Sequence, residues 1–285
     1  MKFDYKKFVK EIYEKAIAED ITTNAAQVAF YFIFALFPLL LFLLSMIGLV
    51  LGAAENIRQE LFGYLQEVIP GSALSLIRDT LDEVTTSGSG GKLTFGALIA
   101  LWSASAGIDN IRIALNDVYD LTETRPWWKY KLTSVLVTLG IALMISLALG
   151  IGFYGPQFLN LLLSPAGLAV DSALLLNLFS FAVMAVSLIT SFALIYSVVP
   201  NHSPFTWRWI TPGAISAIVL WILFSAGFRV YLHFFDSYSK TYGSVGAIIV
   251  LLLWLYLTAL VILVGGVVNA VGEKFGQESS SPKNK

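Results

Sequence analysis

Four polar or amphipathic side chains recur along one side of an otherwise apolar stretch: Trp102, Asp109, Arg112 and Asn116. In a helix this spacing of seven, three and four residues places them on one face. A charge inside a bilayer costs at least about 2.5 kcal/mol on insertion scales, so each one needs a partner or a task. Two interpretations stay open. Either the stripe faces a cavity, with Arg112 holding an anionic group that Asp109 orients, or the two charges neutralise each other near the helix end.

A second intramembrane cation, Arg229, follows Trp221 and Ser225 at four-residue spacing. The expected topology places Arg229 toward the external end of its helix and Arg112 toward the internal end of its own. Two cations at opposite ends of one cavity would suit the passage of an anionic headgroup. Arg229 reaching outward to the membrane interface is the alternative explanation.

Further residues have a functional and a structural interpretation. On the external side, Tyr238, Lys240 and Tyr242 are a gate or headgroup contact, or ordinary interfacial anchors. Pro38 predicts a kink in the first span, because proline removes a backbone hydrogen bond. Gly265 and Asn269 predict close packing and interhelical hydrogen bonding in the last span.

Composition argues against an enzyme. The 285 residues contain no cysteine and two histidines, which excludes thiolate sites and leaves little for a histidine-ligated metal. No P-loop, Gly-x-Ser-x-Gly or His-Glu-x-x-His pattern occurs, and carboxylates do not cluster as metal-dependent hydrolysis requires. We therefore expect no catalytic residues, no metal, no cofactor and no nucleic-acid partner.

The elements that position these residues must be transmembrane helices. Hydrophobic residues make up 57% of the chain, charged residues 13%, and the mean hydropathy is +0.75. Charge-free or nearly charge-free stretches predict an all-α protein with six spans. They cover 25–51, 93–115, 132–156, 172–199, 209–235 and 241–272.

Lysine and arginine bias predicts that both termini are cytoplasmic, with twelve such residues on that side and four on the other. Residues 1–20 have the spacing of a basic amphipathic helix, which lies on the cytoplasmic leaflet or packs against the bundle. Residues 55–92 predict an external segment with short helices. We expect one transmembrane domain over 1–275 and a disordered tail over 276–285.

Several motifs resemble the YihY/BrkB family of bacterial inner-membrane proteins, once labelled ribonuclease BN. They run from about residue 20 to residue 275 and include Ala35-Leu36-Phe37-Pro38, Leu101-Trp102-Ser103-Ala104-Ser105, Val199-Pro200-Asn201 and Tyr238-Ser239-Lys240-Thr241-Tyr242-Gly243-Ser244. The resemblance implies a six-helix protein of the bacterial inner membrane. Some family members are linked to export or transbilayer movement of lipid or lipopolysaccharide precursors.

Three functions are compatible with the sequence. The first is a transporter of a lipid or anionic amphiphile, passive or ion-coupled, with membrane lipids as partners and an anionic lipid or lipid precursor as cargo. The second is a small-solute or ion transporter in which Asp109 is the coupling carboxylate. The third is a membrane scaffold or assembly factor that docks partners on residues 57–84. Glycine faces in the last span also allow a homo-oligomer.

Overall fold

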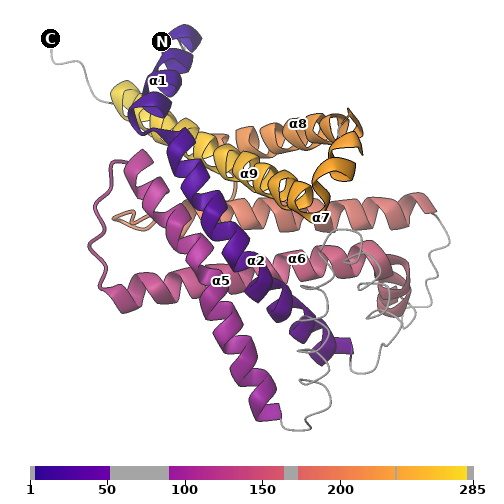
Figure 1. Ribbon diagram of the computed structural model, residues 1–285. Helices are drawn as coiled ribbons and strands as arrows, with labels where there is room; N and C mark the ends of the chain where they lie inside the picture. Colours follow the sequence, from indigo (N-terminus) through magenta and orange to yellow (C-terminus); the bar gives the residue numbers. More distant parts are fainter. Residues whose placement is uncertain (1–3, 52–89, 164–172, 235, 281–285) are drawn as a thin grey trace, which may run out of the picture.

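The computed structural model describes residues 4–51, 90–163, 173–234 and 236–280, and all the regular structure in these ranges is helical (Figure 1). The helices are α1 (Tyr5–Ala18), α2 (Ile21–Leu51), α5 (Gly90–Val118), α6 (Trp127–Leu163), α7 (Ala173–Ser197), α8 (Pro212–Phe234) and α9 (Asp236–Ser280).

Local sequence explains where several of these helices begin and end. The Asp4 side chain caps α1 by accepting hydrogen bonds from the backbone amides of Lys6 and Lys7, each at 3.1 Å. Pro212 opens α8, and Thr211 Oγ1 accepts from the amide of Ala214 at 3.0 Å.

The end of α5 is a left-handed cap. Asp120 has φ of 54°, the amide of Leu121 donates to the carbonyl of Asn116, and the amide of Asp120 donates to that of Asp117. This is the hydrogen-bond pattern of a Schellman motif, which turns the chain sharply back toward the helix it has just left.

The helices pack mainly as consecutive pairs, α2 with α5, α6 with α7, and α8 with α9. Helix α9 also packs along α2, and α6 and α7 run side by side across α2 and α5, whereas α8 lies beside α9 (Figure 1). The largest fully buried side chains of the core come mostly from α5 and α9: Ile111, Leu115, Val261, Leu263 and Val267.

Within the described ranges, five helices are long and apolar enough to cross a membrane: the segments 96–118, 127–152, 175–197, 212–232 and 248–277. The described side chains of α2 give a shorter apolar stretch, Ile21–Leu36. The expectation of an all-helical chain with several apolar spans is therefore confirmed. A sixth span and the orientation of the termini stay predictions.

Three boundaries differ from the sequence-based expectation. Helix α6 continues through Gly155 and Pro156 to Leu163, although this pair was expected to end the span. A Cβ at Gly155 would lie 2.7 Å from Ser180 Oγ on α7, so this glycine serves close helix approach. Helix α9 continues to Ser280, so residues 276–280 of the expected disordered tail are helical. Helix α5 begins at Gly90, inside the expected external segment, most of which lies outside the described residues.

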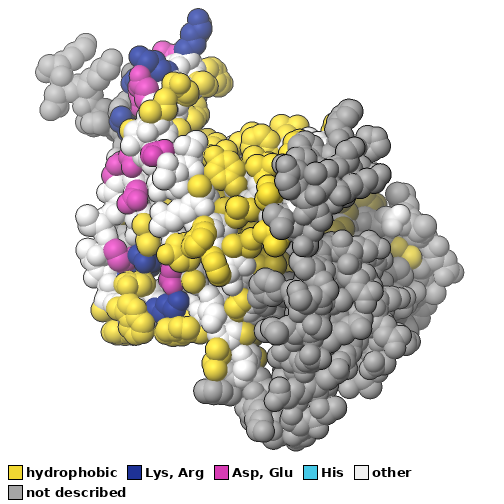
Figure 2. All heavy atoms as spheres, in the orientation of Figure 1, with side chains coloured by type: hydrophobic (Ala, Val, Ile, Leu, Met, Phe, Trp, Pro, Cys, Tyr) yellow, Lys and Arg dark blue, Asp and Glu magenta, His cyan; other side chains and the backbone are white. Residues whose placement is uncertain are grey.

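Polar and apolar surfaces separate on the outside of the molecule. Charged side chains gather on α1 and along the side of the molecule that continues from it. Hydrophobic side chains cover much of the rest of the described surface on this face (Figure 2). Among the five spans found in the described ranges, α8 is the least covered, with 6% of its apolar window buried, and α5 is the most covered, with 61%. These spans therefore differ greatly in how much of their surface the rest of the described chain covers.

Candidate functional site

A buried lysine lies against the polar face of α5. Lys131, in the second turn of α6, places its Nζ 2.7 Å from Asp109 Oδ2 and 2.7 Å from Ser105 Oγ. The same ammonium lies 4.8 Å from the ring of Trp102. An amine held by a carboxylate, a hydroxyl and an aromatic ring is stabilised as a cation in surroundings where an isolated charge would be costly.

The arginine of the same face has a different carboxylate. Arg112 Nη1 donates to Glu123 Oε2 at 2.8 Å, and its guanidinium carbon lies 4.1 Å from the centre of the Tyr130 ring. Glu123 belongs to the segment that joins α5 to α6. Arg112 is buried, with 7% of its surface exposed, and Glu123 is partly buried, so this ion pair is largely shielded from solvent.

Of the two interpretations left open for Asp109 and Arg112, mutual pairing is therefore not the arrangement found. The two side chains share a face of α5, but each binds a partner from the chain that follows, Lys131 for Asp109 and Glu123 for Arg112. The physical reason is the sharp cap at Asp120, which sends residues 121–126 back beside α5 and supplies better-placed counter-ions than the same helix offers.

Glu123 connects three segments of the chain. Arg125 donates to its carboxylate through Nε and Nη2, at 2.8 and 2.9 Å, and Asn116 donates at 3.3 Å. Arg125 Nη2 also donates to the carbonyl of Val199 at the end of α7. The backbone amide of Asn201 donates to Asn116 Oδ1 at 2.9 Å. The segment between α7 and α8 is thereby fixed to the end of α5.

We name this cluster the α5–α6 junction. It comprises Trp102, Ser105, Asp109, Arg112, Asn116, Glu123, Arg125, Tyr130 and Lys131. Its rim is aromatic and reaches the surface, because Trp102 and Trp127 are about half exposed and their ring centres lie 6.0 Å apart. Two of its buried polar atoms, Asp109 Oδ1 and Arg112 Nε, lack a hydrogen-bond partner among the described residues.

Glu123 is strongly biased toward its ionised form. Desolvation raises the pKa of this carboxyl, but hydrogen bonds and charge from Arg125, with a further hydrogen bond from Arg112, lower the pKa to about 2. The carboxylate is therefore charged throughout the physiological range. It acts as a fixed anion that organises two guanidinium groups.

The crossing of α8 and α9 holds the packing residues expected from the sequence. Gly265 lies so close to α8 that a Cβ there would meet the Gly213 carbonyl oxygen at 2.7 Å. Asn269 Oδ1 accepts from the amide of Gly213 at 2.7 Å, and the Tyr196 hydroxyl donates to the carbonyl of Ile262 at 2.8 Å. These groups hold helices together and do not line the α5–α6 junction.

Other predicted residues lie apart from the junction. Arg229 is exposed on α8, which packs mainly against α9. Pro38 lies inside a continuous α2. Tyr238, Lys240 and Tyr242 belong to the first turns of α9, but their side chains lie outside the described residues. The structure thus brings together Trp102, Asp109, Arg112 and Asn116, and leaves the gate assignment untested.

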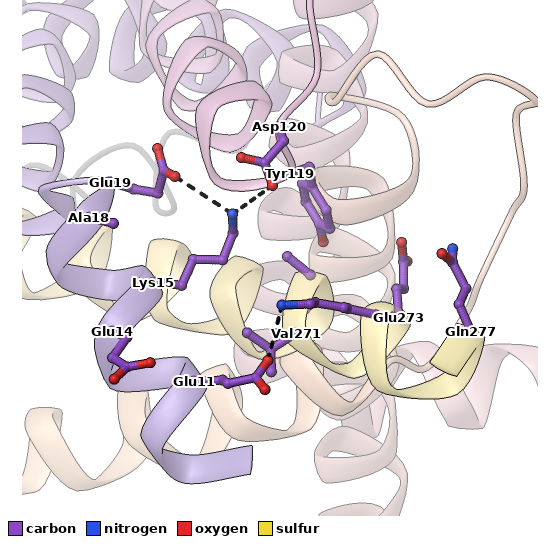
Figure 3. A pocket seen from close by; sticks show the side chains of 12 residues that line it. Glu11, Glu14, Lys15, Ala18, Glu19, Tyr119, Asp120, Val271, Glu273 and Gln277 are labelled. Carbon is purple, nitrogen blue, oxygen red and sulfur yellow. Dashed lines mark hydrogen bonds and ion pairs between the residues drawn. The ribbon is translucent and has the colours of Figure 1, made fainter. Parts of the chain in front are cut away.

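A second feature is a cleft of about 560 Å³ between α1, the end of α5 and the end of α9 (Figure 3). Lys15 points into it and binds Asp120 at 2.8 Å and Glu19 at 3.6 Å. Five carboxylates line the cleft against two lysines, so it is unsuited to an anionic ligand. Within the part of the chain that the structure describes, no group of three His, Asp or Glu side chains is arranged to hold a metal ion.

The fold and its apolar helices define a helical, multi-pass membrane protein. The chain belongs to the family described as virulence factor BrkB, whose model matches residues 12–285. It is 32% identical to YfkH of Bacillus subtilis (strain 168), a protein named as ribonuclease-like, over 94% of this chain and 95% of that protein.

Other relatives carry only a membrane-protein name. The chain is 30% identical to the UPF0761 membrane protein IL2447 of Idiomarina loihiensis, over 81% of this chain and 77% of the relative. It is 25% identical to a UPF0761 membrane protein of Vibrio campbellii, over 94% and 82%. No solved structure matches the chain. The resemblance to the BrkB family inferred from motifs is confirmed.

Sequence reasoning missed the two partners that define the junction. In the sequence, Lys131 directly precedes the apolar run of α6 and Glu123 lies in the loop before it, positions that are ordinary for charged residues at the cytoplasmic side. A usable signal was present. The aromatic and basic run Trp127-Trp128-Lys129-Tyr130-Lys131 has helical spacing between Trp127 and Lys131, so both lie on one face of an early α6 turn.

Proposed function

We propose that this protein moves an anionic lipid or similar amphiphile across the bacterial inner membrane, with both termini in the cytoplasm. The observation that carries the proposal is the buried Lys131, which binds a carboxylate and also lies against a half-exposed tryptophan in an apolar span. An anionic headgroup that enters beside Trp102 would compete with Asp109 for the lysine, and its acyl chains would remain in lipid.

The charge balance of the α5–α6 junction supports an anionic ligand. The cluster contains three cations, Arg112, Arg125 and Lys131, and two carboxylates, Asp109 and Glu123. It therefore carries one net positive charge. Arg112 Nε, buried without a partner among the described residues, supplies a donor that a phosphate oxygen would satisfy.

The aromatic rim supports contact with lipid. Trp102, Trp127 and Trp128 are each about half exposed or more. Tryptophan is enriched where membrane hydrocarbon meets headgroups, because its ring is apolar and its N–H is polar. The junction is therefore suited to receive a headgroup from the side as well as from water.

The test is transbilayer movement of a fluorescent phosphatidylglycerol in proteoliposomes, with wild type compared with Lys131→Met. We expect movement in the wild type and a loss of most of it in the variant. The matched control is Lys129→Met, which removes an exposed lysine two residues earlier. Equal loss in both variants, or no movement by folded wild type, would overturn the proposal.

Loss of function must be separated from loss of fold. Removing Lys131 alone leaves the partly buried Asp109 without its cation, and breaking a buried pair typically costs up to about 3–5 kcal/mol. The double variant Asp109→Asn/Lys131→Met removes both charges and should restore stability. If transport returns with stability, Lys131 is a structural residue and the headgroup assignment is wrong.

A second candidate, an ion-coupled solute transporter, is favoured by one observation. Asp109 Oδ1 is buried and accepts no hydrogen bond from the described residues, as a carboxylate awaiting a proton or cation would. Asp109→Asn separates the two candidates. It abolishes gradient-driven solute uptake if Asp109 is the coupling group, but it leaves lipid movement in place if Lys131 holds the headgroup.

A further inference from the structure

The N-terminal helix α1 has two different apolar sides. One side packs on the bundle through partly buried Phe8, Ile12 and Ala16, and the Phe8 ring meets that of Phe275 on α9 edge to face at 5.4 Å. The other side is apolar and exposed. Val9, Tyr13 and Ile17, spaced by four residues, are 63%, 67% and 60% exposed.

The charges of α1 are divided in the same way. Lys6 and Lys10 lie beside the exposed apolar stripe, because successive residues advance by about 100° around a helix. Two of the glutamates turn toward the opposite side, where Glu11 binds Lys274 at 3.4 Å and Glu19 binds Lys15 at 3.6 Å. The cleft side is therefore acidic, and the apolar stripe is bordered by Lys6 and by Lys10, which also pairs with the exposed Glu14 at 3.4 Å.

The connection to α2 fixes where this stripe can lie. Only Glu19 and Asp20 separate α1 from α2, and Asp20 adopts a left-handed turn with φ of 41°. The C-terminal end of α1, which carries the exposed Ile17, therefore lies within a few residues of the start of the apolar helix α2. In Figure 2 the hydrophobic side chains of the projecting α1 form a band along one side of it.

We propose that α1 is a membrane-surface arm, whose stripe of Val9, Tyr13 and Ile17 inserts among anionic lipid headgroups at the bilayer surface. Tyrosine with aliphatic residues is suited to the boundary of hydrocarbon and headgroups, and Lys6 and Lys10 provide attraction to anionic lipid. The arm is independent of the transport pathway, because none of its residues belongs to the α5–α6 junction.

The absence of cysteine from the sequence allows a direct test with single labels on the full-length protein. Ile17→Cys and its neighbour Ala18→Cys are each labelled with an environment-sensitive NBD fluorophore. Ala18 lines the acidic cleft, so it is a control one residue away on the other side (Figure 3). The proteins are reconstituted into phosphatidylcholine vesicles with or without phosphatidylglycerol, each containing a doxyl-labelled lipid as quencher.

We expect the label at position 17 to emit at shorter wavelength and to be quenched several-fold more strongly than the label at position 18. Phosphatidylglycerol will strengthen the quenching, and Lys6→Gln/Lys10→Gln will remove that dependence. Equal quenching at positions 17 and 18 overturns the proposal. Equal quenching of position 17 with and without phosphatidylglycerol overturns the proposed preference for anionic lipid. Shielding at position 17 that rises with protein density but not with quencher would instead assign the stripe to a second copy of the chain.

Discussion

Helices α5 and α8 each carry one arginine within an apolar span, yet the two helices have opposite surroundings. The α5 segment has the lower mean hydropathy, 1.2 against 1.9, and is 61% buried where α8 is 6% buried. Where lipid surrounds the protein, the more polar helix belongs inside and the more apolar one outside. The two helices follow this rule, but hydropathy alone does not rank all five spans, because α9 has the highest mean hydropathy, 2.8, and is 33% buried.

The two arginines show what enclosure changes. Arg112 is held by a carboxylate at 2.8 Å and by the face of an aromatic ring, whereas Arg229 is exposed on its helix. A buried guanidinium depends on its counter-ion, but an exposed one is free to reach the interface. The same residue type should thus respond very differently to substitution in the two helices.

The largest effect is expected at the counter-ion of the buried arginine. Glu123→Gln leaves both Arg112 and Arg125 without their shared carboxylate, and breaking a buried pair in this way costs about 3–5 kcal/mol. The measurement is thermal unfolding in detergent, followed by circular dichroism. Asp117→Asn, an exposed carboxylate near the end of the same helix, is the control and should have little effect. Equal shifts in both variants would show that the junction does not depend on Glu123.

Acid should remove part of the same stabilisation. The pKa of Glu123 is lowered from 4.5 to about 2 in the folded protein, so its contribution is fully present above pH 4.5 and is lost as pH falls toward 2. Stability measured across this window should decline more steeply in wild type than in Glu123→Gln. Parallel curves for the two proteins would contradict the assignment.

An intermediate effect is expected where helices touch without charge. Gly265→Ala places a methyl group against the Gly213 carbonyl and the Tyr196 hydroxyl, and overpacking of this kind costs typically about 1–3 kcal/mol. Gly272→Ala on the same helix has no neighbour within 4 Å and should instead stabilise α9 slightly. Unfolding temperatures of the two variants should move in opposite directions. A shared direction would rule out the close crossing.

The smallest effect is expected at the exposed arginine. Arg229→Ala should change stability by no more than about 0.5 kcal/mol, as substitutions on open surfaces usually do. If unfolding in detergent shows a loss comparable to that of Glu123→Gln, Arg229 is enclosed in the assembled protein. The contrast between the two helices would then be false.

Much of the fold follows from the sequence, because its signals are local. Long apolar runs predicted the helices, and spacing by three and four residues correctly placed Trp102, Asp109, Arg112 and Asn116 along one helix. Predicted helix boundaries were wrong where the boundary depends on a contact with another helix. Gly155 and Pro156 appear to end a helix when read alone, but the pair lies inside α6 where α7 packs closely against Gly155.

The partners of the polar face could not be predicted in the same way. Within α5 alone, Arg112 is the oppositely charged residue whose spacing allows it to pair with Asp109. The actual pairs depend on the path of residues 119–126, which the left-handed Asp120 reverses along α5. A non-glycine residue with positive φ leaves little trace in a single sequence, so the reversal and the ion pairs that Glu123 and Lys131 form are seen only in three dimensions.

The short loop at Asp120 also has a consequence for the order in which the chain is made. Arg112 is followed by its counter-ion Glu123 after 11 residues, and Asp109 by Lys131 after 22. Asp109 and Arg112 can therefore both be neutralised within the newly synthesised α5–α6 hairpin, before α7, α8 or α9 has left the ribosome. Asn201, which ties Asn116 to the next loop, arrives 85 residues later. The hairpin can enter the membrane with its charges already paired, and the later helices then close around it.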